Sequence, residues 1–114
     1  MLVGFITQAQ DYNVTFKVNT SNIANEVGPN GMYVGDGVLG GSDAYAMSDD
    51  DMDGVWEVTV SMEAGTSGNY AFFNSPTSSS DWGTKENLEG KSCGDPTNYW
   101  NRILEPVNED LTLV

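Results

Sequence analysis

The chain has 114 residues, a length that suits one ordinary domain with a single core. Seventeen acidic and four basic residues give a formal net charge of -13, so no basic patch is available for nucleic acid or an anionic membrane. The sequence contains no histidine, which excludes Ser-His-Asp, Cys-His and imidazole-metal chemistry.

Residues 1–10 have two interpretations. The apolar run from Leu2 to Ile6, followed by small and polar residues around Ala9, fits either a leader remnant or an edge strand. No run approaches the roughly 20 apolar residues of a membrane helix, so we expect no membrane insertion. We place the folded domain at residues 11–114.

Alternating apolar and polar residues predict two half-buried strands, at 12–19 and 55–62. The aromatic run within 69–74 predicts a strand that is buried on both faces, and residues 65–68 are expected to join it to 55–62 as a hairpin. Shorter candidate strands, bounded by Gly, Pro, Asn or Asp, are 31–35, 44–47, 99–104 and 111–114.

No stretch shows apolar residues at helical spacing over three turns, although residues 81–88 are compatible with a short turn. About seven or eight short strands without helices predict an all-β fold, and we expect an antiparallel immunoglobulin-like β-sandwich. Tyr99 and Trp100 are adjacent in one of these predicted strands, so one ring should face the core and the other the solvent.

An acidic cluster precedes the strand at 55–62. Asp49, Asp51 and Asp53, followed by Gly54, match the opening of an EF-hand calcium loop, but Val60 stands where that loop requires a bidentate glutamate. A solvated hairpin turn explains the cluster as well, because Asp and Gly favour turns and charge discourages edge pairing. Calcium at these three carboxylates is therefore a candidate cofactor.

A second polar cluster follows the aromatic strand. Sugar binding needs a flat apolar face together with planar polar groups that hydrogen-bond vicinal hydroxyls. Trp82 offers the face, and the adjacent polar side chains offer the hydrogen bonds; the alternative is that Trp82 covers the core. The candidate carbohydrate-binding residues are Trp82, Asn87, Lys85, Glu86, Tyr45, Trp100 and Tyr33.

Cys93 is the one cysteine of the sequence, which excludes an intrachain disulfide and a CxxC site. Its thiol is either buried or unpaired, or it pairs with a cysteine located beyond Val114. A pair of carboxylates that hydrolyses glycosides remains an open enzymatic alternative, although a small domain of short strands seldom forms the deep cleft required. We therefore expect no enzyme activity.

The order of these elements resembles that of starch-binding-type carbohydrate-binding modules, which are β-sandwiches of marine bacterial polysaccharide-utilisation proteins. The resemblance rests on short segments along nearly the whole chain: 14–18, 32–35, the glycine-rich 39–41, the acidic turn and strand 49–60, the aromatic 70–73, and then Trp82 and Asn87. It implies that Trp82 stacks on a glucan and pairs with a second tryptophan placed after the glycine-rich loop. Tyr45 stands near that place instead of tryptophan, which leaves starch or another polysaccharide open.

The resemblance and the composition together predict noncatalytic polysaccharide binding by a secreted, extracellular domain attached to an enzyme or to further domains. We expect no nucleic-acid partner. The alternative is an extracellular adhesion or structural module that calcium stabilises at Asp49, Asp51 and Asp53, without sugar binding.

Overall fold

The computed structural model of the chain describes residues 10–23 and 25–114. The predicted leader remnant or edge strand at residues 1–10 lies, apart from Gln10, outside the described residues. No helix within the described ranges is long and apolar enough to cross a membrane.

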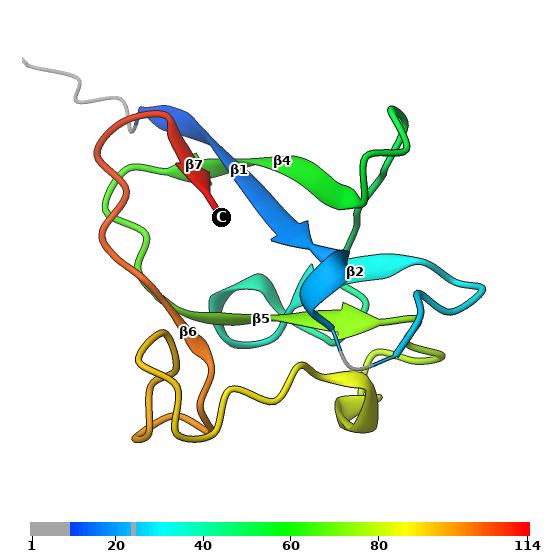
Figure 1. The fold of residues 1–114 in the computed structure, drawn as a ribbon. Helices are drawn as coiled ribbons and strands as arrows, with labels where there is room; N and C mark the ends of the chain where they lie inside the picture. The colour runs from blue at the N-terminus through cyan, green and yellow to red at the C-terminus, as the bar shows by residue number, and fades with distance from the viewer. Residues whose placement is uncertain (1–9, 24) are drawn as a thin grey trace, which may run out of the picture.

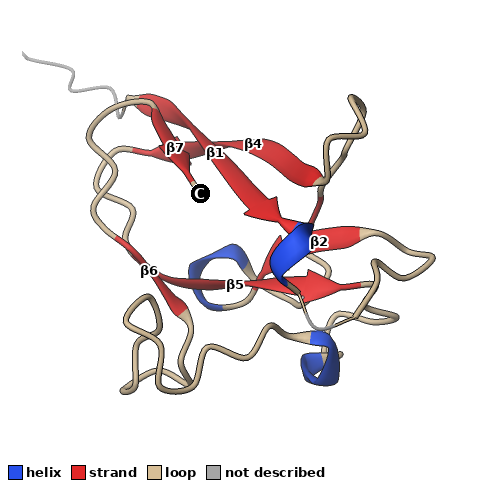
Figure 2. Cartoon of the chain, viewed as in Figure 1, coloured by secondary structure: helices blue, strands red, loops and turns tan. Residues whose placement is uncertain are grey.

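Seven strands and three short 3-10 turns follow one another along the described residues (Figures 1 and 2). The strands are β1 (Asp11–Asn19), β2 (Met32–Gly35), β3 (Tyr45–Ala46), β4 (Val55–Glu63), β5 (Gly68–Asn74), β6 (Arg102–Leu104) and β7 (Leu111–Leu113). The turns are η1 (Thr20–Asn22), η2 (Gly37–Leu39) and η3 (Trp82–Thr84). The predicted β-sandwich is confirmed, while its assignment to the immunoglobulin type remains a prediction.

The strands form two layers, visible in Figure 1 as β4, β1 and β7 above β2, β5 and β6. The first sheet has the order β4-β1-β7 and the second the order β3-β2-β5-β6. Every pairing is antiparallel except β1 with β7, which is parallel and so departs from the expected pattern. A bridge between Ser48 and Glu57 joins the two sheets at one corner.

The core lies between the sheets because each sheet turns one apolar face inward. Val14, Phe16 and Val18 of β1 are buried at alternate positions, as the sequence period predicts. Opposite them, Tyr70 and Phe72 of β5 are buried, and the Tyr70 ring meets Phe16 edge-on with ring centroids 4.9 Å apart.

Strand β5 is buried on both faces, as predicted from its aromatic run: Tyr70, Ala71, Phe72 and Phe73 are each at most 5% exposed. The outer face cannot be covered by the other sheet, so irregular segments cover it. Gly37 of η2 lies so close that an added Cβ would be 2.1 Å from the Asn69 carbonyl oxygen, and its φ of 53° also favours glycine.

The predicted hairpin between 55–62 and 69–74 is wrong, because β4 and β5 belong to different sheets. β5 has apolar residues on both faces and occupies the middle of a sheet, whereas the half-buried β4 lies at a sheet edge. The connection pairs with a third segment instead: the Gly65 amide donates to the Val107 carbonyl at 2.8 Å, and the Val107 amide donates to the Thr66 carbonyl at 3.0 Å.

The predicted strand at 99–104 is shorter than expected, and β6 begins at Arg102. Tyr99 and Trp100 have positive φ angles of 52° and 59°, so they lie in a turn and not in a strand. The expectation that their rings alternate across a strand is therefore wrong. Hydrogen bonds explain the turn: the Asn98 and Trp100 amides both donate to the Asp95 carbonyl, at 3.0 and 2.9 Å.

Replacing Phe16 with alanine should lower the free energy of unfolding by about 3–5 kcal/mol, because a buried ring is removed from between the sheets. Urea denaturation monitored by tryptophan fluorescence measures the effect. Ser61→Ala, at an exposed position of β4, is the control and should change stability by less than about 0.5 kcal/mol. A loss below about 1 kcal/mol for Phe16→Ala would contradict a core centred on this ring.

Candidate functional site

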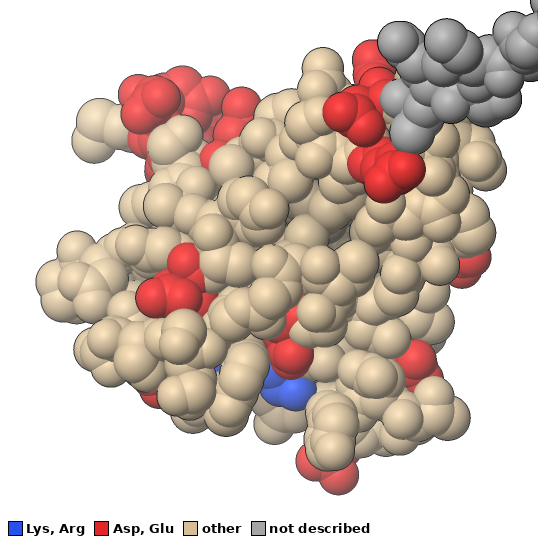
Figure 3. All heavy atoms as spheres, turned by 180° about the vertical axis from the view of Figure 1, so that it is seen from behind, with Lys and Arg blue, Asp and Glu red and all other residues tan. Residues whose placement is uncertain are grey.

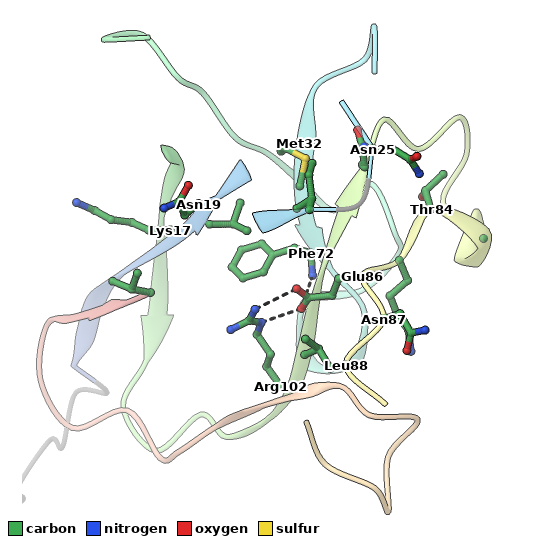
Figure 4. A pocket seen from close by; sticks show the side chains of 16 residues that line it. Lys17, Asn19, Asn25, Met32, Phe72, Thr84, Glu86, Asn87, Leu88 and Arg102 are labelled. Atoms are coloured by element: carbon green, nitrogen blue, oxygen red, sulfur yellow. Dashed lines mark hydrogen bonds and ion pairs between the residues drawn. The ribbon is translucent and has the colours of Figure 1, made fainter. Parts of the chain in front are cut away.

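An open cavity of about 800 Å³ lies between the C-terminal end of β1 and the inner face of the second sheet (Figure 4). This volume lies within the usual range of small-molecule sites. Residues 83–88, which begin within η3, form a third wall. The predicted polar residues Lys85, Glu86 and Asn87 all line the cavity, although Trp82 does not.

The ion pair between Arg102 and Glu86 lies at the centre of the cavity in Figure 4. The two residues come from segments that lie along the same side of β5. Arg102 pairs with Tyr70, and the bridge between Phe73 and Lys85 places Glu86 beside Phe72. Tyr70 and Phe72 both face inward, so the side chains of Arg102 and Glu86 meet on the inner face of the sheet.

The pair has bidentate geometry. Arg102 Nε donates to Glu86 Oε1 at 2.7 Å, and Nη2 donates to Oε2 at 3.0 Å. The guanidinium carbon also lies 5.0 Å from the centroid of the Phe72 ring, a cation–π distance. Burial alone would lower the pKa of Arg102, but the hydrogen bond and the charge of Glu86 outweigh burial, and this pKa is raised. The side chains remain 20% and 14% exposed, so the pair is accessible from the cavity.

The cavity contains three of the four basic residues of the chain, namely Lys17, Lys85 and Arg102. Figure 3 shows acidic side chains scattered over one face of the molecule, with basic atoms confined to a small area. Each cation in the cavity nevertheless has a partner. Lys17 Nζ lies 3.5 Å from Glu57 Oε2, and in Figure 4 its side chain points away from the Arg102–Glu86 pair.

Lys85 supports the loop that carries Tyr99. Its Nζ donates to the Tyr99 carbonyl at 2.9 Å and to Asn101 Oδ1 at 3.0 Å. The buried Asn101 in turn donates through Nδ2 to Asp36 Oδ2 and to Asn98 Oδ1, both at 3.0 Å. The ammonium of Lys85 therefore ties three loops together and is not directed at an open ligand position.

Trp82 lies on the opposite side of the same segment. Its ring is 6.0 Å from that of Phe73, which alternates with Phe72 along β5 and so belongs to the outer face. Phe73 is fully buried, whereas Trp82 remains 49% exposed. The structure therefore does not bring Trp82 and Glu86 to one surface. Residues 82–88 run along the edge of the sheet beside β5, with Trp82 against the outer Phe73 and Glu86 beside the inner Phe72.

A set of hydrogen bonds fixes the segment before Trp82. Ser42, fully buried, donates through Oγ to the Ser78 carbonyl at 2.6 Å and accepts from the Asp81 amide at 3.0 Å. Asp81 Oδ2 accepts from the amide and the hydroxyl of Thr77, each at 3.0 Å. Trp82 is thus held on an ordered turn and packs against a buried ring.

The other predicted aromatic residues are distributed over several surfaces. Tyr33 is the β-sheet partner of Phe73 and shares the outer face near Trp82. Tyr45 pairs with the inward-facing Val34 at the sheet edge and is 37% exposed, so it belongs to the other face. Trp100 is partly buried, while its neighbour Tyr99 is 83% exposed.

The acidic cluster forms a tight turn before β4. One ligand atom from each of Asp49, Asp51 and Asp53 lies within 4.8 Å of the others, so the cluster can hold a metal ion. The carboxylates also accept backbone hydrogen bonds, from Gly54 to Asp49 Oδ2 at 3.0 Å and from Val55 to Asp53 Oδ1 at 2.8 Å. The hydrogen bond from the Val55 amide lowers the pKa of Asp53, and the side-chain hydrogen bond with Asp53 raises the pKa of Asp51.

Sequence reasoning did not select Arg102, and no local pattern marks it. The arginine is separated from Glu86 by an irregular segment, and only the pairing of both segments with β5 brings them together. Cys93 is exposed and forms no disulfide with any residue that the structure describes. Comparisons of the chain with protein-family models, curated proteins and solved structures give no match.

Acidification should weaken the loop that contains Asp95. Its Oδ1 accepts from the Thr97 hydroxyl and amide at 2.6 and 2.9 Å, which lowers the pKa of Asp95. A lowered folded-state pKa contributes stability above the unfolded pKa of about 3.9, and this contribution is lost as the pH falls through the folded value. The stability difference between wild type and Asp95→Asn should be constant near neutral pH and shrink below about pH 4.

Chemical denaturation between pH 2 and 7 measures this difference. Asp43→Asn, which makes the same change at an exposed carboxylate, is the matched control. A difference between wild type and Asp95→Asn that persists unchanged to pH 2 would contradict the role of the Asp95 charge.

Proposed function

We propose that this domain binds a polysaccharide without catalysing a reaction, and that a sugar ring stacks on the Trp82 indole. The observation that carries the proposal is the half-exposed Trp82 ring, which packs against the fully buried Phe73. An indole in solvent offers the flat apolar face that the C–H groups of a sugar require. The ordered turn reduces the conformational entropy that binding would otherwise cost.

Further features support a binding surface near this ring. Tyr33 shares the outer face of the sheet next to Phe73, and it supplies a second aromatic side chain with a hydroxyl group. The ligand we propose first is a glucan, with other polysaccharides as alternatives. The proposal includes a secreted domain attached to an enzyme or to further domains, because such a module retains its partner at an insoluble substrate.

The cavity supports a noncatalytic function. Glycosidases generally use two carboxyl groups that flank the scissile bond. Glu86 is the one Asp or Glu side chain among the cavity-lining residues of the described chain, and Arg102 already occupies both of its oxygens. Among the residues that the structure describes, the cavity therefore lacks the second carboxyl group that glycoside hydrolysis generally uses.

Trp82→Ala should abolish retention on the polysaccharide, with a loss of at least about 2 kcal/mol in binding free energy, roughly thirtyfold in Kd. Affinity electrophoresis in gels containing different polysaccharides measures retention, and thermal denaturation reports the fold. Trp82→Phe keeps an aromatic face and should retain part of the affinity.

Tyr99→Ala is the matched control, because it removes an exposed ring from another loop and should leave binding unchanged. Unchanged retention of Trp82→Ala would refute the proposal. A large fall in the melting temperature together with lost binding would show that Trp82 is a core residue.

A second function is favoured by the convergence of Asp49, Asp51 and Asp53, namely that of an extracellular adhesion or structural module stabilised by calcium. Hard carboxylate oxygens are the ligands that calcium prefers, and extracellular sites bind it with Kd values of about 0.1–1 mM. This function requires no sugar ligand.

Under that function, 10 mM CaCl2 should stabilise the domain by about 1.4–2.7 kcal/mol, because binding to the folded state alone shifts the unfolding equilibrium. Differential scanning calorimetry with and without EGTA measures the shift in melting temperature. Asp51→Asn should remove most of it, whereas Asp43→Asn should not. Equal melting temperatures in CaCl2 and EGTA would exclude calcium from this turn.

A further inference from the structure

We infer that the cavity between the sheets is a second saccharide site, separate from Trp82, in which the Arg102–Glu86 pair binds vicinal hydroxyls of a short neutral saccharide. The inference rests on the proposed function for the ligand class and adds a location and a chemical specificity. It places a sugar-binding surface on each side of the segment 82–88.

Arg102 retains a donor edge that no described residue uses. Its Nε and Nη2 bind Glu86 side-on, and no hydrogen bond joins Nη1 to any residue in the described ranges. Among those residues, every buried side-chain nitrogen or oxygen has a partner, so Nη1 is not sealed inside the protein. The Nη1 edge of the guanidinium is therefore accessible to solvent beside the cavity that Arg102 lines.

Glu86 supplies acceptors beside these donors. A carboxylate has about four lone-pair positions, and Glu86 uses three of them, two for Arg102 and one for the Phe72 amide at a long 3.4 Å, which leaves one position for a ligand. Each sugar hydroxyl is both a donor and an acceptor. An arginine edge next to a carboxylate therefore matches two adjacent hydroxyls, one of which accepts from Arg102 while the other donates to Glu86.

The position of the pair is fixed before any ligand binds. The guanidinium lies over the buried Phe72 ring, and the bidentate contact holds Glu86 in the same plane. Ile23, Met32 and Leu88 also line the cavity and can contact the C–H groups of a sugar. Polar side chains lie beside them, among them Asn19, Asn25, Asn74 and Asn87. Apolar side chains with polar groups that fix the orientation of the ligand are the usual composition of a small-molecule site.

The charge balance favours a neutral saccharide over a uronate or a sulfated sugar. Arg102 is neutralised by Glu86, Lys85 is engaged by Tyr99 and Asn101, and Lys17 pairs with Glu57. An anionic ligand at the open edge of Arg102 would approach the Glu86 carboxylate. Lys85 is the cavity cation without a carboxylate partner among the described residues, but its ammonium is directed at the Tyr99 and Asn101 oxygens and not at this edge. The net charge of -13 on the chain adds repulsion.

The composition of the chain permits a direct test by NMR. Arg102 is the one arginine, so its Nε–H gives a single arginine side-chain signal, and the three tryptophans give three indole signals. The probes are neutral gluco- and xylo-oligosaccharides and oligo-uronates of matched length. In Trp82→Ala, which lacks the outer stacking face, the Arg102 signal should still shift with a neutral oligosaccharide and remain unchanged with oligo-uronates.

The double variant Glu86→Gln/Arg102→Met removes the ion pair while keeping similar volumes, and it should raise the Kd for that oligosaccharide at least about tenfold in calorimetric titrations. Glu89→Gln/Lys91→Met makes the same charge changes at exposed positions outside the cavity and should bind as wild type does. Because the Arg102 signal is read in a protein with the pair intact, the test holds even if the double variant fails to fold.

The outcomes separate the two proposals. A shift of the Trp82 indole signal in the wild type without a shift of Arg102 overturns the cavity site and leaves the Trp82 proposal standing. A shift of Arg102 with oligo-uronates alone overturns the neutral specificity. No shift of either signal with any neutral oligosaccharide of the set overturns both proposals.

Discussion

The burial of β5 on both faces is the constraint on which the rest of the structure depends. A strand with four successive buried residues, from Tyr70 to Phe73, must lie inside a sheet and must be covered twice. The sheet β4-β1-β7 covers the inner face through Phe16 and its neighbours. Within residues 10–23 and 25–114 no further sheet reaches the outer face. Irregular segments such as η2 and the one that carries Trp82 cover it instead.

Because β5 is covered on both faces, the segment 82–88 beside it can place side chains on two different surfaces. Residues 82–88 run along the edge of the sheet beside β5, with Trp82 against the outer Phe73 and Glu86 beside the inner Phe72. A free loop would average over many positions and lose entropy on binding a ligand. A segment anchored on both faces of a buried strand holds its side chains in place in advance.

The sequence predicted those features that depend on local periodicity. Alternation located β1 and β4 to within one residue, and the aromatic run identified β5 as a doubly buried strand. The hairpin prediction was wrong because pairing between distant segments determines the position of this turn. Residues 65–68 were expected to close a hairpin, but Gly65 forms a backbone hydrogen bond with the distant Val107. The prediction paired β4 with β5 because the two strands are close in sequence. β5 is buried on both faces and therefore lies in the middle of the other sheet.

In the candidate site, too, local features could be predicted from the sequence and long-range contacts could not. The sequence left two alternatives for Trp82, a stacking face for a sugar or a cover for the core, and the structure leaves its ring 49% exposed beside the buried Phe73. Lys85, Glu86 and Asn87 line one cavity. The pairing of Arg102 with Glu86 could not be predicted. It depends on the register with which β6 and the bridge at Lys85 align with β5, and the sequence does not reveal that register. Periodicity reports which face of a strand is buried, but it does not report which distant segment lies beside it.

The turn at residues 99–100 has a strained backbone, and the contacts that hold it also hold a wall of the cavity. Two successive non-glycine residues with positive φ cost about 1–3 kcal/mol each, so the surrounding contacts must over-determine them. Asp95 accepts backbone hydrogen bonds from one side of the turn, and Lys85 donates to the Tyr99 carbonyl from the other. Because Lys85 precedes Glu86, the contacts that hold the strained turn also fix the carboxylate that meets Arg102. The strain is thus coupled to the preorganisation of the ion pair, and relaxing the turn would loosen the centre of the cavity.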